Sequence, residues 1–236
     1  TQWLVDTQVM NAGLVMPMMG GTVGLSAVSI NYGDIMKSGW GEESGQFIFQ
    51  PSQGSFTATD MSLQASYGKS LSDKFSLGAT AKMISQNIDD VSISGLAFDI
   101  GTQFNTGYRG ISMGAVVSNF GPDVDSQAPE DASYEEFPGM SLPMTFSFGV
   151  VGEAIPGLNA GLNVLKQADM AQEFIFNGEY SVADIASLRF SYNISNPQEP
   201  MSFGVGLGMA GVTANVAITT TQYFDNVMRF GIGYAL

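Results

Sequence analysis

The sequence predicts an all-β protein, a transmembrane antiparallel up-and-down β-barrel, from two observations. Along most of the chain, large apolar side chains alternate with small or polar ones, and these segments are joined by connections that are alternately short and long. A soluble sheet would need helices or a second sheet to cover so many apolar faces. A barrel in a membrane turns its large residues to lipid and its small or polar residues to the lumen.

The alternation divides the single domain, residues 1–236, into thirteen predicted strands. They are 8–16, 22–36, 57–69, 75–88, 92–106, 110–119, 143–153, 158–167, 172–181, 186–194, 201–209, 212–220 and 227–236. In the strand 75–88, Phe75, Leu77 and Met83 share the predicted lipid face, while Ser76 and Thr80 share the other. Residues two apart lie on the same face of a strand, so the pattern assigns a face to each residue.

The strand 22–36 departs from this alternation. Val23 and Leu25 share one parity, whereas Val28 and Ile30 share the other. A β-bulge inserts one extra residue and would turn both sets to the same face. We therefore expect a bulge near Ala27.

The lengths of the connections orient the barrel. Outer-membrane barrels have short periplasmic turns and longer external loops, so the long connections 37–56 and 120–142 are predicted to be external. The last strand then ends in the periplasm, and the first begins outside. Because bacterial barrels have an even number of strands, we expect fourteen, with one strand preceding Thr1.

Composition excludes several classes of function. Charged residues make up 13% of the chain, about half the usual share in soluble domains, and the net charge of −14 argues against a nucleic-acid partner. The chain has no Cys and no His, so it has no disulfide, no Ser-His-Asp triad and no zinc site of the common kinds. No apolar run is long enough for a transmembrane helix. We expect a protein that is not an enzyme and uses no cofactor or metal.

Polar residues on the predicted lumen face are the first candidate site residues. Lys82 and Asp99 lie on adjacent strands, and counting from the turn at Asp90-Val91 places them directly opposite each other. They form either an ion pair that fixes the register or a contact for a ligand headgroup or a plug. Further candidates for contacts with lumen contents or a plug are Arg189, Arg229, Gln103 and Asn105.

The long external loops carry more aromatic side chains than solvation requires. These are Phe47, Phe49, Phe56, Tyr134 and Phe137, which we expect to cap the barrel mouth or to face a partner or substrate. Acidic residues also concentrate in the external loops, where they solvate the loops, bridge divalent cations or form a docking face. The Asp123–Asp125 spacing lacks the EF-hand pattern, so no dedicated calcium site is predicted.

Several segments resemble the PorV/PorQ family of outer-membrane proteins, which is grouped with the FadL-like fatty-acid channels. They are 1–6, 13–18, 21–26, 97–102, 105–110, 117–122 and 224–234, and the most specific read Phe98-Asp-Ile-Gly-Thr102 and Ser118-Asn-Phe-Gly-Pro122. The resemblance implies a FadL-like barrel of fourteen strands with an N-terminal plug in the lumen. The Gly-Met-Gly-Gly-Ala and Trp-Asn-Pro-Ala-Gly blocks of that plug segment do not occur here.

The resemblance also implies a function. It points to the outer membrane of a Gram-negative (diderm) bacterium, where the chain would be an accessory or shuttle subunit of a type IX-like protein secretion system, bound to a larger translocon and surrounded by lipid. The alternatives are a FadL-like channel for small hydrophobic molecules and a structural barrel that packs with envelope partners. A channel predicts an apolar pocket in the lumen, whereas a lumen lined throughout by Gly, Ser, Thr and Asn would argue against one.

Overall fold

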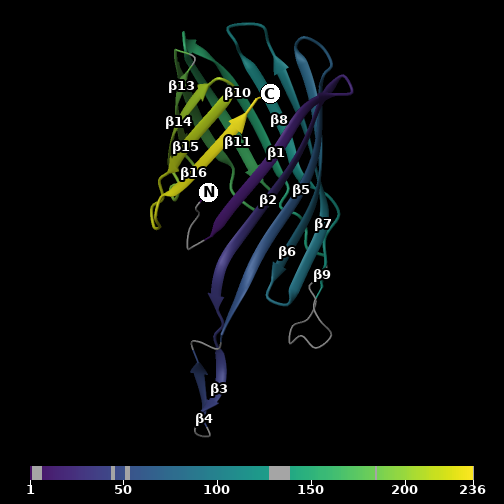
Figure 1. The fold of residues 1–236 in the computed structure, drawn as a ribbon, viewed down its shortest axis with the longest axis vertical. Helices are drawn as coiled ribbons and strands as arrows, with labels where there is room; N and C mark the ends of the chain where they lie inside the picture. The colour runs from purple at the N-terminus through teal and green to yellow at the C-terminus, as the bar shows by residue number, and fades with distance from the viewer. Residues whose placement is uncertain (2–6, 44–45, 51–53, 128–138, 184, 236) are drawn as a thin grey trace.

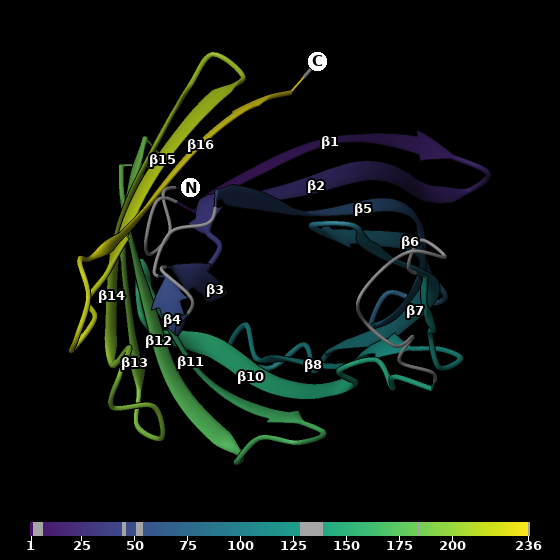
Figure 2. The same cartoon turned by 90° about the horizontal axis from the view of Figure 1, so that it is seen from below.

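The computed structural model describes residues 1, 7–43, 46–50, 54–127, 139–183 and 185–235, apart from the side chains of Glu43 and Phe47. Its main element is one antiparallel sheet that curves round a central space (Figures 1 and 2). The described residues contain no helix that is long and apolar enough to cross a membrane. The predicted all-β barrel fold is confirmed.

Thirteen strands follow one another round the sheet in chain order, each antiparallel to the next. They are β1 (Gln8–Met18), β2 (Gly21–Met36), β5 (Ser55–Ser70), β6 (Phe75–Ile88), β7 (Val91–Asn105), β8 (Ser112–Phe120), β10 (Thr145–Ile155), β11 (Leu158–Gln167), β12 (Glu173–Val182), β13 (Ala186–Asn193), β14 (Met201–Met209), β15 (Val212–Thr219) and β16 (Val227–Tyr234). Each bound lies within two residues of its predicted position.

The long connection 37–56 contains regular structure that the sequence did not predict. It contains a separate hairpin, β3 (Gly39–Glu43) and β4 (Gln46–Gln50), which extends beyond the barrel at the end opposite the C-terminus (Figure 1). The rings of Trp40 and Phe49 meet edge to face across this hairpin, with centroids 5.9 Å apart. The other unpredicted strand is β9 (Ser126–Gln127), which pairs with the start of β7.

The outward face of the sheet is apolar and exposed, as a lipid-facing surface must be. Ile232 is 88% exposed and Met83 is 55% exposed. The apolar side chains that are buried among the described residues are Ala58, Ala97, Val124 and Val227. A water-soluble domain of this size would bury a far larger apolar core, so the sheet is built for a membrane.

The two end strands, β1 and β16, run in the same direction, because they are the first and last of thirteen strands that are each antiparallel to the next (Figure 1). Antiparallel closure between them requires one further strand, which stays a prediction. On the free edge of β1, Thr1 exchanges backbone hydrogen bonds with Val9, at 2.8 and 3.0 Å.

The expected bulge near Ala27 is wrong. The β2–β5 ladder runs without interruption from Thr22 to Asn31, and its irregularity lies between Asn31 and Asp34. Val28 and Ile30 therefore share the inward face with the small residues that precede them on the strand. The large residues of β2 change parity at Val28 because the inward face of the strand changes there from small residues to large apolar ones.

Candidate functional site

The inward apolar residues of β2 enclose a cavity of about 360 Å³ near the end of the barrel that carries the long loops. Its apolar wall includes Val28, Ile30, Ile84, Ile93, Val124 and Leu142. The register explains how four strands supply this wall. Val28 pairs with Ser62, which pairs with Ile84. The next inward-facing row, which is nearer the long loops, joins Ile30, Asp60, Gln86 and Ile93.

The connection after β8 completes the wall by folding against the inner face of β7. We call residues 121–127 and 139–144 the inner loop. Val124 and Met140 exchange two backbone hydrogen bonds of 2.9 Å across it. Val124 lies so close to Gly95 of β7 that a Cβ atom there would be 2.2 Å from a Val124 methyl group. Glycine at position 95 therefore makes room for the inner loop.

The sequence predicted that aromatic side chains of both long connections, 37–56 and 120–142, cap the barrel mouth or face a partner or substrate. Tyr134 and Phe137, like the side chain of Phe47, lie outside the described residues. Phe49 is exposed on the β3–β4 hairpin, and Phe56 lies beneath the ammonium group of Lys37, which is 5.8 Å from the ring centroid. The side chains that cover the pocket are aliphatic ones that sequence reasoning did not single out.

Asp60 supplies the charged group among the described residues that line the cavity. The hydroxyl group of Tyr32 donates a hydrogen bond of 2.7 Å to Asp60 Oδ2. Asp60 Oδ1 is buried and has no hydrogen-bond partner in the described part of the chain. Sequence reasoning missed this residue, although its inward parity in a strand of serines and glutamine was a usable signal.

Lys82 and Asp99 form an ion pair of 2.7 Å, with side chains 13% and 19% exposed. The prediction that they lie directly opposite each other is wrong. The turn between their strands is the two-residue Asp89-Asp90 rather than Asp90-Val91, which shifts the pairing. Lys82 pairs in the ladder with Ala97, and Asp99 pairs with Thr80. The charges meet on the diagonal of the lumen face.

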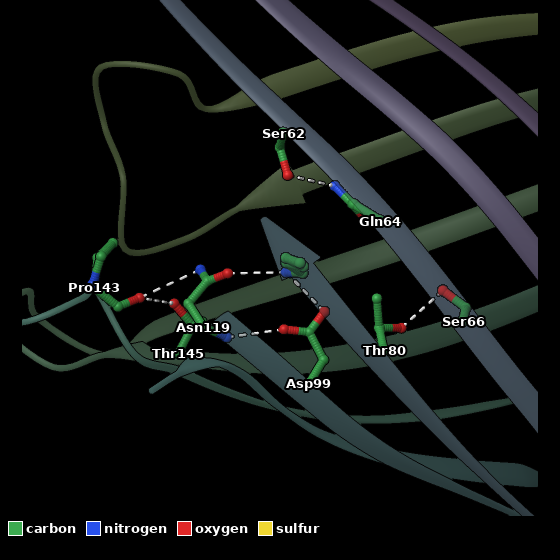
Figure 3. Close-up of polar contacts among 9 residues, drawn as sticks. Ser62, Gln64, Ser66, Thr80, Asp99, Asn119, Pro143 and Thr145 are labelled. Carbon is green, nitrogen blue, oxygen red and sulfur yellow. Dashed lines mark hydrogen bonds and ion pairs between the residues drawn. The ribbon is translucent and has the colours of Figure 1, made fainter. Parts of the chain in front are cut away.

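Asn119 joins this ion pair to both ends of the inner loop. Lys82 Nζ donates to Asn119 Oδ1 at 2.9 Å, and the backbone N–H of Asn119 donates to Asp99 Oδ1 at 2.9 Å. The Asn119 amide group also donates to the carbonyl oxygen of Pro143, at 3.4 Å. Figure 3 shows Asp99, Asn119 and Pro143 in this arrangement, which fastens the loop to the barrel wall.

The ion pair lies between two different parts of the lumen. Lys82 is the next inward residue of β6 after Ile84, on the side away from the loops. Asp99 borders a larger and less apolar cavity of about 800 Å³, whose lining includes Ser66, Thr80 and Gln103. On this side of the barrel, the lumen is thus more apolar toward the loops and more polar toward the short turns.

Of the other predicted lumen residues, Gln103 lines the same cavity as Asp99, and the remaining three lie elsewhere. Arg189 bonds Glu179 and Asn215 at 2.6 and 2.8 Å, and Arg229 donates to Thr219 at 2.6 Å, both on the far wall. Asn105 accepts a bond from the N–H of Gly107 and shapes a short turn.

The acidic residues of the inner loop act within the loop. Asp123 accepts a hydrogen bond from the Ser141 hydroxyl group at 2.9 Å, and Asp125 accepts one from the Gly139 N–H at 2.8 Å. Among the described residues, no group of three or more acidic side chains is arranged to hold a metal ion.

Comparison with known proteins identifies the fold. No protein-family model matches the chain, and no curated protein sequence does. The Pseudomonas putida toluene transporter TodX is similar in structure, with a TM-score of 0.57 and 10% identity over 92% of this chain and 81% of that chain. A Pseudomonas aeruginosa FadL homologue gives a TM-score of 0.52 and 14% identity over 89% and 68% of the two chains. The chain therefore has the fold of FadL-like outer-membrane barrels; the PorV/PorQ assignment stays a prediction.

Proposed function

We propose that the chain lets small hydrophobic molecules cross the outer membrane through its lumen. The observation that carries this proposal is the apolar cavity between β2, β5, β6, β7 and the inner loop. An apolar wall inside a lumen that is otherwise polar is unfavourable while it contacts water. A bound hydrophobic molecule offsets this, at about 25 cal/mol per Å² of apolar surface removed from water.

The size and position of the cavity support the same proposal. Its volume of about 360 Å³ is at the lower end of the usual range for small-molecule sites. A molecule that enters from the loop end meets this cavity first and then the polar lumen beyond Lys82 and Asp99. The toluene transporter, with a similar fold, also supports a hydrophobic cargo. The proposal treats the chain as a transporter and not as an enzyme.

The accessory role in a type IX-like secretion system has weaker support. It rests on the sequence resemblance, and neither similar structure has a secretion role in its name. It also gives no reason for the apolar cavity. Copurification with a large translocon would favour it over transport.

Filling the cavity tests the transport proposal. Ser62→Phe places an aromatic ring among Val28 and Ile84, whereas Ala65→Phe on the same strand points to lipid and is the matched control. Diderm cells that make Ser62→Phe should take up labelled propylbenzene at least about tenfold more slowly than cells with the Ala65→Phe protein. Heat-modifiable gel migration confirms folding of both. Equal uptake by two folded variants would overturn the proposal.

A further inference from the structure

Asp60 places an unsaturated hydrogen-bond acceptor in the wall of the apolar cavity. An ionised carboxylate has about four acceptor sites, and the bond from Tyr32 uses one. The buried Oδ1 has no partner among the described residues, which is an unfavourable state for a polar atom. Asp60 is one of the residues that line the cavity, so its carboxylate is an acceptor for a donor group of a ligand bound there.

The lysines nearest the cavity do not offer a free positive charge. Lys82 already contacts Asp99 at 2.7 Å and Asn119 at 2.9 Å. Lys37 is paired with Asp89 at 2.5 Å, at the loop end of the neighbouring strands. Neither is among the residues that line the cavity. An anionic headgroup would therefore meet the charge of Asp60 without a compensating cation.

We propose that the pocket selects hydrophobic molecules with an O–H or N–H donor, such as alcohols, phenols and amines, and rejects carboxylates. The apolar part of the ligand packs against Ile30 and Ile84, and its donor bonds to Asp60. This inference rests on the proposed transport function, because it assigns the substrate class of the same cavity. It makes Asp60 a specificity-determining residue.

A purely structural role for Asp60 is the competing explanation. Tyr32 lies in the irregular stretch of β2 between Asn31 and Asp34, and its bond to Asp60 would hold that stretch in place. Such a role predicts that a substitution changes stability and leaves the ranking of ligands unchanged. The choice of ligand headgroup therefore separates the two roles.

Four probes that share a phenylpropyl group test the inference by calorimetric titration of the detergent-purified protein. They are 3-phenylpropan-1-ol, 3-phenylpropylamine, propylbenzene and 3-phenylpropanoate. The alcohol and the amine should bind about tenfold more tightly than propylbenzene, equivalent to about 1.4 kcal/mol. The carboxylate should bind most weakly. If the wild-type protein binds the carboxylate as tightly as the alcohol, the inference is overturned, and no variant is needed to show it.

Asp60→Asn then tests the residue. It keeps the shape and removes the charge, so the preference for the amine over propylbenzene should largely disappear and the carboxylate should bind more tightly. Asp90→Asn makes the same change of charge in an exposed turn outside the cavity and should leave the ranking as in the wild type. An unchanged ranking in Asp60→Asn would overturn the inference.

The same titrations separate this inference from the transport proposal. If propylbenzene binds to the wild type and not to Ser62→Phe, the cavity is a hydrophobic site even when the headgroup ranking fails. If none of the four probes binds the folded wild type, the proposed function fails and the specificity of Asp60 fails with it.

Discussion

The two halves of the barrel wall have the same outer surface and different inner ones. Outward-facing residues are large and apolar on both, for example Leu96 and Phe98 on β7 and Phe176 on β12. Toward the loops, the inner face of β2, β6 and β7 carries the aliphatic side chains Val28, Ile30, Ile84 and Ile93. The inner face of β11 to β15 is more polar, with residues such as Asn163, Asn177, Ser191 and Asn215, although Leu165 and Ile175 also lie on it.

This contrast separates two requirements. Lipid imposes the outer pattern on every strand, because any polar surface there is unfavourable. The lumen imposes no such rule, so an apolar inner patch on one half needs another cause. A ligand that contacts that half supplies one. Each of the following substitutions is paired with a matched change on the other half.

The largest difference is expected from the charged pairs. Lys82→Met leaves Asp99 in a confined site without its cation and removes a donor to Asn119, which should lower stability by about 3 kcal/mol. Arg189→Met breaks a pair whose side chains are 47% and 40% exposed, and should cost no more than about 1 kcal/mol. Urea unfolding followed by gel mobility measures both. Equal losses would mean that the two networks do not differ in their role.

A smaller effect is expected from glycines on the inner face. Gly95→Val would clash with Val124 and displace the inner loop, at a cost of about 2 kcal/mol and with loss of probe binding. Gly231→Val on β16 has no atom within 4 Å of the new Cβ and should be close to neutral. Thermal unfolding and propylbenzene titration measure the two consequences. Unchanged binding by Gly95→Val would show that the inner loop is not part of the site.

The fold could be predicted from the sequence because the outer pattern is local. Lipid selects the same alternation on each strand, so strand bounds and order follow from residues two apart. The hairpin β3–β4 was not predicted, because its strands are only five residues long and show too little alternation to be recognised. The alternation of large and small residues along a single strand is enough to show which of its faces contacts lipid.

The site could be predicted only in part, because its geometry depends on distant residues. The parity change at Val28 was visible, but a bulge and an apolar lumen produce the same local pattern. The choice between them depends on Val124 and Leu142, which are about a hundred residues away along the chain. The Lys82–Asp99 contact was anticipated, whereas the role of Asn119 needs the loop that it fastens.

The smallest effect concerns the acidic residues of the loops. Asp125→Ala removes the acceptor for the Gly139 N–H and should loosen the inner loop by about 1 kcal/mol, which speeds its amide hydrogen exchange about fivefold. Asp169→Ala changes an exposed acid after β11 and should leave exchange in its own connection unchanged. If both variants behave alike, Asp125 serves only solvation, and the other contacts of the inner loop, such as the packing of Val124 and the bond from Asn119 to Pro143, hold it in place.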